Sequence, residues 1–419
     1  MKSKFLKYHN NRLHLEDVDL GKIADEVGTP CYVYSRRSFE QAWCQYNSAF
    51  KERSHRICYA VKANDNLSIL KALTLIGSDF DVVSIGELNK VIAAGGKPAG
   101  VVFSGVGKTR NEIEEALKAG VGCINLESCE EFERLESVAE NMGAFVNVAV
   151  RVNPDVDPKT HPYISTGLKD SKFGVPIDDA RELYRRISSS KWLNPSGIAC
   201  HIGSQITIVD PILEAVGHVV DLALDLKTIG IQIETIDVGG GLGIDYRGET
   251  PPTINELVDG LCRVVPEEFK LVLEPGRSIV GPAGLMLTRV EFIKKTKDRN
   301  FVIVDAGMND LLRPALYDGW HDVLTYCESL AGVEGDICDV VGPICETGDT
   351  LAKNRRLHVF EGDLVAVADC GAYGSVMGSN YNARLRCAEI LINESSYRIV
   401  RRRQTFDSLI SDEKDVLID

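Results

Sequence analysis

The chain has 419 residues, of which 44% are hydrophobic and 26% charged, a balance typical of a globular protein with two or three domains. Its formal net charge of −14 argues against a nucleic-acid or anionic-membrane surface. The N-terminus lacks an apolar core of signal-peptide length, no run approaches 18 apolar residues, and the twelve cysteines show no metal-ligand spacing. We therefore expect a cytoplasmic protein with reduced cysteines, no membrane segment and no bound metal.

Segments with the composition of strands begin near Ile57, Asp79, Val101, Cys123 and Phe145, at intervals of 22 residues. Helical patterns fill the intervals without internal similarity, so the spacing is that of one strand–helix unit and not of a solenoid repeat. Three further strands are expected, and eight strands alternating with helices indicate a (β/α)8 barrel. The first helices are expected at 66–75, 85–94, 110–119 and 129–141, and the last strands at 197–201, 235–238 and 270–274.

Between the fifth and sixth strands, residues 153–176 are rich in Pro, Asp, Gly and Lys and predict a long functional loop. After about residue 284 the sequence pattern changes, because strand-like runs follow one another without regular helices between them. These runs predict a β-rich second domain, and the alternating N-terminal runs at 5–8 and 12–15 are expected to pair into it. The expected strands of this domain are 301–305, 340–344, 363–369, 388–393 and 397–401.

A single lysine, Lys62, stands near the end of the apolar run I-C-Y-A-V-K-A-N (57–64). Burying an ammonium costs several kcal/mol unless it is paired or becomes a neutral amine, and a neutral, desolvated lysine is what Schiff-base chemistry requires. Taken alone, a strand-end lysine that extends to solvent is the simpler interpretation. Chemistry is favoured because three further motifs also close strand-like runs.

These motifs are H-I-G-S-Q (201–205), G-G-G-L-G (239–243) and E-P-G-R (274–277). Active sites of α/β barrels lie at the C-terminal ends of the strands, so the motifs converge on one face. Each motif alone has a simpler explanation: a core histidine, a tight turn, or an ion pair between Glu274 and Arg277. Together, a lysine, a glycine turn for phosphate, an acid and a flat aromatic base predict a pocket for pyridoxal 5′-phosphate (PLP).

With these motifs the chain resembles the alanine-racemase-like class of PLP-dependent decarboxylases (group IV), and within it the diaminopimelate decarboxylases. The similarity spans nearly the whole chain and extends to motifs at 153–157, 161–167, 172–174, 310–317, 342–349 and 369–382. The resemblance implies a PLP-binding TIM-like barrel with a C-terminal β-sandwich domain that includes the N-terminal strands. It also implies a homodimer whose two active sites are shared across the interface. The implied divisions are residues 1–36 (N-terminal strands), 37–284 (barrel) and 285–419 (β-sandwich).

For the barrel, the resemblance implies that Lys62 holds PLP as a Schiff base, that His201 stacks on the ring and that Glu274 keeps the ring nitrogen protonated. Asp81 would support the ring environment, and Arg277 would also reach the substrate. The phosphate is expected to contact Ser204, Gly240, Gly241 and the turn formed by Glu274, Pro275, Gly276 and Arg277.

For the β domain, the resemblance implies that Cys345 is the acid that protonates the carbanion and that Glu346 pairs with the distal ammonium of the substrate. Both would enter the neighbouring subunit's site, although an isolated cysteine in an apolar run is more often inert. The guanidinium of Arg313 has paired N–H groups that can bind a carboxylate, and the hydroxyl of Tyr317 would orient that carboxylate. Tyr373 would contact phosphate and substrate.

The implied reaction is decarboxylation of the small-molecule substrate meso-2,6-diaminopimelate to L-lysine and CO2, the last step of lysine biosynthesis, through a PLP external aldimine. Alternatives are a related decarboxylase acting on ornithine, arginine, carboxynorspermidine or a carrier-linked amino acid, a racemase, or a PLP-binding protein without activity. The run R-P-A-L-Y (313–317) favours a substrate with a distal carboxylate. Intact Lys62, Cys345 and Glu346 argue against a loss of chemistry, and the bulky Trp320 bears on fine specificity.

Overall fold

The computed structural model describes residues 3–157 and 171–418, so the motif at 161–167 lies outside the described residues. The chain divides into two compact units. The barrel unit comprises Glu40–Ile244 and Thr250–Ser278, and the β unit comprises Met1–Phe39, Asp245–Glu249 and Ile279–Asp419.

The barrel unit contains a closed ring of eight parallel strands, which confirms the predicted (β/α)8 barrel. Neighbours in the ring follow chain order, and the ring closes where β13 pairs with β5. A short strand, β10 (Val175–Pro176), lies in the segment predicted as a loop and pairs with β9. The ring strands are β5 (His55–Ala60), β6 (Asp79–Val82), β7 (Val101–Phe103), β8 (Cys123–Leu126), β9 (Val146–Asn153), β11 (Leu193–Ala199), β12 (Thr235–Asp237) and β13 (Lys270–Leu273).

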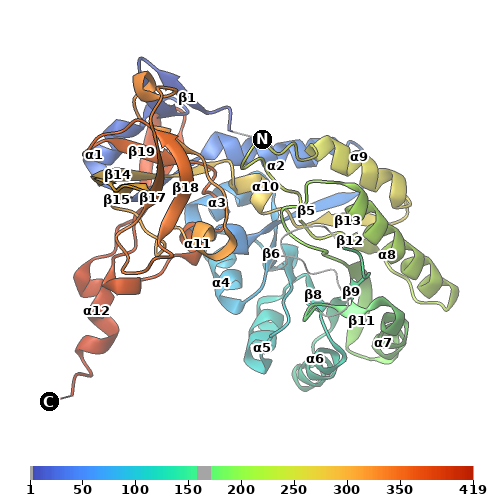
Figure 1. Ribbon diagram of the computed structural model, residues 1–419. Coiled ribbons are helices and arrows are strands. Elements are labelled where there is room, and N and C mark those ends of the chain that lie inside the picture. Colours follow the sequence, from blue (N-terminus) through green and yellow to red (C-terminus); the bar gives the residue numbers. More distant parts are fainter. Residues whose placement is uncertain (1–2, 158–170, 419) are drawn as a thin grey trace. The chain divides into compact units, whose positions relative to one another are not determined.

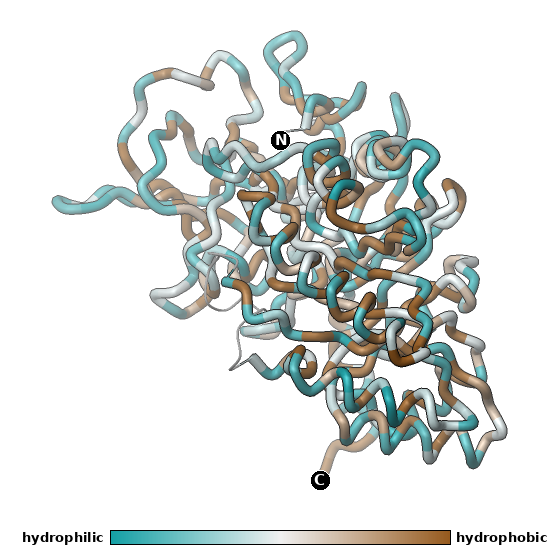
Figure 2. Tube along the Cα trace, turned by 90° about the vertical axis from the view of Figure 1, so that its right-hand side faces the viewer, coloured by the Kyte–Doolittle hydropathy of each residue, from teal (hydrophilic) through white to brown (hydrophobic). Residues whose placement is uncertain are grey.

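Helices α5 to α8 lie outside these strands (Figure 1). In the hydropathy tube the helical coils alternate between brown and teal, the pattern of helices that bury one face (Figure 2). Local sequence sets their ends: Thr109 and Glu112 form a capping box at the start of α5, and Gly120 ends it in the left-handed region. The helices of this unit are α3 (Leu67–Leu75), α4 (Ile85–Ala93), α5 (Arg110–Ala119), α6 (Cys129–Met142), α7 (Ile177–Ser189), α8 (Asp210–Thr228) and α9 (Ile254–Val264), with α2 (Arg36–Ala49) and α10 (Arg277–Val280) at the unit boundaries.

The β unit is built on a mixed sheet in which most neighbours are antiparallel, while β15–β17 and β4–β20 are parallel. Its central strand β14 pairs with β15, β19 and β4. The strands are β4 (Cys31–Ser35), β14 (Gly284–Lys295), β15 (Asn300–Val304), β16 (Val323–Thr325), β17 (Asp336–Val341), β18 (Thr350–Leu357), β19 (Leu364–Val367), β20 (Ala388–Asn393) and β21 (Ser396–Arg401).

The N-terminal segment contributes to the β unit in two ways. Strands β1 (Leu6–His9), β2 (Arg12–Leu15) and β3 (Val18–Asp19) form a separate three-stranded sheet, followed by α1 (Leu20–Val27). Strand β4, which the sequence pattern did not predict, enters the large sheet between β14 and β20. All five of its residues are buried, so it lacks the polar–apolar alternation that marks a strand in sequence. Two short α-helices also belong to the unit, α11 (Arg313–Tyr317) and α12 (Phe406–Lys414).

Of the helices in the described part of the chain, none combines the length and the hydropathy needed to span a bilayer.

Candidate active site

Lys62 lies just past the C-terminal end of β5, in the 3₁₀ turn Val61–Ala63. Its Nζ donates a hydrogen bond to Asp81 Oδ2 at 2.7 Å, and Asp81 belongs to the neighbouring strand β6. The Asp81 side chain is fully buried, whereas about a third of the Lys62 side chain is exposed, 36%. The ammonium is therefore held from one side by a buried carboxylate and stays within reach of a ligand.

Two further carboxylates lie at the ends of neighbouring strands, Asp237 on β12 and Glu274 after β13. Burial, together with the charges of Asp237 and Asp81, raises the pKa of Glu274 well above its usual range. Burial also raises the pKa of Asp237, to about 6. Among the described residues, Glu274 Oε1 and Asp81 Oδ1 have no hydrogen-bond partner. A positively charged or proton-bearing ring placed beside these carboxyl groups would favour their ionised forms.

His201 follows β11 and contacts the glycine turn. Its Nδ1 accepts a hydrogen bond from the Gly240 N–H at 3.3 Å, so this nitrogen carries no proton. Burial, followed by the positive charges of Arg151 and Lys62, lowers the pKa of His201 well below its usual range. The imidazole is therefore a neutral flat ring, suited to stacking on an aromatic cofactor.

The glycine turn after β12 is required by close backbone approach. A Cβ on Gly240 would lie 2.4 Å from the carbonyl oxygen of Glu274. Gly241 has φ +109°, and a Cβ there would lie 2.6 Å from the carbonyl oxygen of Gly203. Only glycine fits both positions, so this backbone can approach a bound phosphate closely.

The E-P-G-R turn packs against the Lys62 segment, since the Ala60 N–H donates to the carbonyl of Pro275 at 3.2 Å. A Cβ on Gly276 would lie 2.9 Å from the Cβ of Ala63. The buried Arg277 side chain donates from Nη2 to Ser204 Oγ at 2.9 Å. A guanidinium, a hydroxyl and the glycine turn thus stand at neighbouring strand ends, the donor set that a phosphate needs.

These observations fit PLP. Lys62 offers the amine, the unpartnered Glu274 Oε1 matches a protonated ring nitrogen, and the two glycines form the phosphate cradle. The barrel set predicted from sequence, including Asp81, His201, Ser204 and Arg277, is therefore brought to one end of the strands.

Sequence reasoning missed an ion pair that supports His201. Arg151 on β9 pairs through Nη1 with Glu127 Oε1 at 3.1 Å, and its Nη2 donates to the carbonyl of His201 at 3.2 Å. Glu127 also accepts the N–H groups of Gly105 and Gly174. Both charged residues close strand-like runs, as Lys62 does, and that signal could have found them. Asp237 was also missed, although it too lies at the end of a strand-like run.

On the β unit, Arg313 begins α11 and is buried, and its Nη1 lies 2.7 Å from His321 Nε2. Tyr317 ends the same helix. Tyr373 has φ +55°, a left-handed backbone within the run D-C-G-A-Y-G (369–374).

Cys345 and Glu346 are exposed in the loop between β17 and β18. Buried Asp349 fixes this loop, because its carboxylate accepts the N–H groups of Met308 and Ile344 at 2.6 and 2.7 Å. A second segment contacts it as well. The Cys345 N–H donates to Asn382 Oδ1 at 3.2 Å, and the Tyr381 hydroxyl donates to Glu346.

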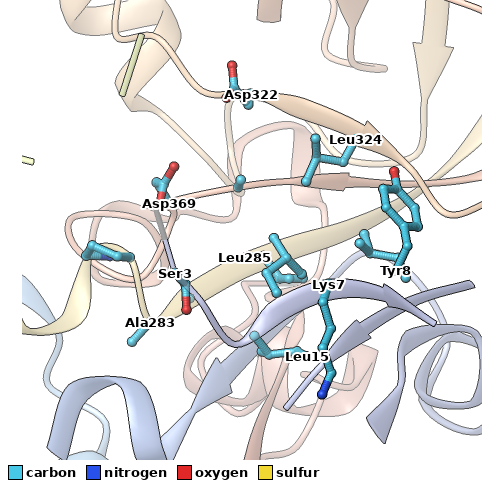
Figure 3. A pocket seen from close by; sticks show the side chains of 14 residues that line it. Ser3, Lys7, Tyr8, Leu15, Ala283, Leu285, Asp322, Leu324 and Asp369 are labelled. Atoms are coloured by element: carbon cyan, nitrogen blue, oxygen red, sulfur yellow. The ribbon is translucent and has the colours of Figure 1, made fainter. Parts of the chain in front are cut away.

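The β unit also contains a cavity of about 140 Å³ lined from β1, β2, β14 and β16 (Figure 3). Leu15, Leu285 and Leu324 contribute to its lining. Lys7 in its wall pairs with Asp17, and the Tyr8 hydroxyl donates to the carbonyl of Thr325. The cavity is an apolar gap between the N-terminal sheet and the large sheet.

An α/β barrel that presents a carboxylate-paired lysine, a glycine cradle and a buried acid at its C-terminal strand ends defines a class, the PLP-binding barrel enzymes. Residues 36–281 match the family model for the pyridoxal binding domain of pyridoxal-dependent decarboxylases.

The chain belongs to the diaminopimelate decarboxylase family of these enzymes. It is 50% identical to the diaminopimelate decarboxylase of Pseudomonas aeruginosa over 97% of this chain and 98% of that protein. The crystal structure of the Helicobacter pylori enzyme complexed with L-lysine is similar with a TM-score of 0.92 and 41% identity, covering 95% of this chain and 100% of that one. The M. jannaschii enzyme in complex with L-lysine has a TM-score of 0.93 and 35% identity, with 99% and 98% covered.

Proposed function

We propose that this protein decarboxylates meso-2,6-diaminopimelate to L-lysine and CO2, the last step of lysine biosynthesis, with PLP as its cofactor. The observation that carries the proposal is the barrel pocket in which Lys62 pairs with Asp81 while Glu274 presents an unpartnered buried oxygen. The names of the relatives supply the substrate.

When bound, PLP supplies an electron sink for the electron pair released as a carboxylate leaves as CO2. In the proposed assignment Lys62 holds the cofactor through its amine, and His201 covers one ring face as a neutral imidazole. Glu274 keeps a proton on the ring nitrogen. Ser204, Arg277, the turn Glu274–Arg277, Gly240 and Gly241 bind the phosphate, with Arg277 also contacting substrate.

The β unit is proposed to supply substrate recognition and the acid. Arg313, Tyr317 and Tyr373 orient the end of the substrate that does not react, and Glu346 pairs with its ammonium. Cys345 delivers a proton to the reacting carbon after CO2 has left. Support comes from the exposure of Cys345 and Glu346, which suits residues that act in a neighbouring subunit.

We further propose that the protein is a homodimer with shared active sites and works in the cytoplasm. Sedimentation at micromolar concentration tests the dimer. Mixing a Lys62→Met chain with a Cys345→Ser chain tests the sharing: mixed dimers recover activity if each site takes Lys62 from one chain and Cys345 from the other.

The reaction is tested by incubating the protein with PLP and meso-diaminopimelate, with L-lysine and L-ornithine in parallel, and separating the amines by chromatography. L-Lysine formed from diaminopimelate, with little cadaverine or putrescine from the other two, supports the proposal. Turnover of ornithine or lysine in preference would identify a related decarboxylase instead. A visible PLP–protein chromophore without turnover of any substrate would identify a binding protein.

A further inference from the structure

We infer that His321 and Tyr246 are positioning residues for Arg313, holding its guanidinium in the orientation that reads the substrate's non-reacting carboxylate. The inference rests on the proposed function, which assigns that carboxylate to Arg313. It adds two residues that lie outside the motifs found in the sequence. One of them, Tyr246, lies in a segment that barrel residues flank in sequence.

His321 is fully buried, and its two ring nitrogens have different partners. Nε2 lies 2.7 Å from Arg313 Nη1, and Nδ1 lies 2.8 Å from the carbonyl oxygen of Ala368. A guanidinium only donates and a carbonyl only accepts, so Nδ1 carries the proton and Nε2 accepts from Arg313. His321 is therefore a neutral imidazole in one tautomer, and its ring is fixed at both ends.

The ring of Tyr246 contacts the same guanidinium. The carbon Cζ of Arg313 lies 4.5 Å from the centroid of the Tyr246 ring, within cation–π distance. The Tyr246 ring also meets the His321 ring edge to face, with centroids 5.3 Å apart and an interplanar angle of 80°. His321 holds one nitrogen of the guanidinium by a hydrogen bond, and the ring of Tyr246 lies against its central carbon, so together they restrict the rotation of the guanidinium.

Tyr246 belongs to Asp245–Glu249, a segment that packs with the β unit although barrel residues flank it in sequence. The next residue, Arg247, lies over the Trp320 ring at 4.4 Å. Arg355 lies against the same ring at 3.1 Å and donates to the carbonyl of His321 at 3.0 Å. The backbone of His321 and the segment that carries Tyr246 are thus held by one cluster.

The chemistry of the two partners suits a substrate-binding arginine. An imidazole in this tautomer and a phenol are both neutral, so neither cancels the charge that a carboxylate must meet. A guanidinium has five N–H donors, so one hydrogen bond to His321 is compatible with a bidentate contact to a ligand. Because the guanidinium is already oriented before the substrate arrives, less conformational entropy is lost when the substrate binds.

The test compares His321→Asn with His321→Gln. The asparagine amide can reach the Ala368 carbonyl but not Arg313, whereas the glutamine oxygen can occupy the position of Nε2. Decarboxylation at one end of a diamino diacid leaves a product that keeps the other carboxylate, so L-lysine carries the group that Arg313 reads. Cadaverine lacks it and serves as the matched ligand.

For His321→Asn we expect KM for diaminopimelate and Kd for L-lysine to rise about 10- to 100-fold. We also expect kcat within about 3-fold of wild type, full PLP content and unchanged cadaverine binding. His321→Gln should recover most of the KM. Tyr246→Leu should raise KM as His321→Asn does, by a smaller factor, while Tyr246→Phe, which keeps the ring face, should not.

An unchanged KM in His321→Asn would overturn the inference, and so would a joint loss of kcat and PLP in both His321 variants, which indicates a purely structural role. If His321→Asn does not fold, the comparison of Tyr246→Leu with Tyr246→Phe tests the inference by the same criteria. Wild-type protein is assayed first: no turnover of diaminopimelate would show that the proposed function has failed. Normal wild-type turnover with unaffected variants would show that only the positioning role has failed.

Discussion

The ammonium of Lys62 and the carboxylate of Asp81 lie 2.7 Å apart on neighbouring strand ends of the barrel, with Asp81 fully buried and Lys62 partly exposed. A pair of this kind is stable because the buried charge has its partner, and it is reactive because the partner can be exchanged for a ligand. Only one oxygen of Asp81 is used, while the other has no hydrogen-bond partner in the described part of the chain. The pair therefore lies where we propose that the amine of Lys62 holds PLP.

Replacing Lys62 by methionine should lower kcat/KM by at least about 10³-fold, because the amine that holds the cofactor is lost. Absorbance should show loss of the covalent PLP chromophore, and steady-state assays should show loss of turnover. Lys227→Met is the control, because Lys227 forms an exposed ion pair with Glu268 at 2.5 Å. A Lys62→Met enzyme with near-normal turnover would contradict the assignment.

Asp81→Asn should keep the size of the side chain while removing the charge that holds Lys62. We expect the rate of PLP capture by the apoenzyme and kcat both to fall about 10- to 100-fold, because the lysine loses the partner that orients it. Stopped-flow absorbance after mixing with PLP measures the first effect. Asp17→Asn, which removes the exposed partner of Lys7, is the matched control and should leave both rates unchanged.

Glu274→Gln should change how the stability of the cofactor-free protein depends on pH. The folded-state pKa of Glu274 is raised, so between the unfolded and folded pKa values the folded state binds more protons, and stability falls as pH rises. The variant lacks this loss, so at pH 8 it should be more stable than the cofactor-free wild type, and the difference should be smaller at pH 5.

Thermal unfolding of both cofactor-free proteins at several pH values measures this effect. Exposed Glu267 provides the control variant Glu267→Gln. The Glu274→Gln holoenzyme should at the same time lose at least about 10²-fold in kcat, because the acid at the ring nitrogen is gone. Equal pH dependence of the two cofactor-free proteins would contradict the raised pKa.

Gly241→Ala should weaken PLP binding and destabilise the barrel by about 2–4 kcal/mol, because its φ of +109° and its 2.6 Å approach to the Gly203 carbonyl exclude a Cβ. Gly217→Ala in α8 is the control, since a Cβ there meets nothing within 4 Å and should be neutral or stabilising. Titration of apoenzyme with PLP and urea unfolding measure the two effects. Equal behaviour of the two variants would show that the turn tolerates a side chain.

Cys345→Ser should lower kcat about 10²- to 10³-fold with little change in PLP content, because a serine hydroxyl is a much poorer acid than a thiol. Cys44→Ser is the control, as Cys44 is likewise exposed but lies on α2. Proton delivery can be followed separately from CO2 release by deuterium incorporation into the product. Full activity in Cys345→Ser would assign the acid to another group.

The sequence by itself determined the barrel and predicted that the motifs of the candidate site meet at one end of its strands. An interval of 22 residues between strand-like runs holds one strand and one helix, and repeated units of this kind form a parallel barrel. The residues that follow its strands then lie together at one end of the barrel. Lys62, His201, the glycine turn and the E-P-G-R turn could therefore be predicted from their positions alone. The uniformly buried β4 could not, because a strand with both faces covered has no alternation to recognise.

The tertiary structure alone decided which distant charges meet. Asp237 and Glu274 share a buried acid site, and Arg151 pairs with Glu127 behind His201, because strand order around the ring brings those ends together. Tyr246 packs on Arg313, 67 positions away in the chain numbering, with a segment that leaves the barrel sequence to join the β unit. Periodicity reports which face of its own element a residue occupies, whereas the partner across that face is set by how the elements pack.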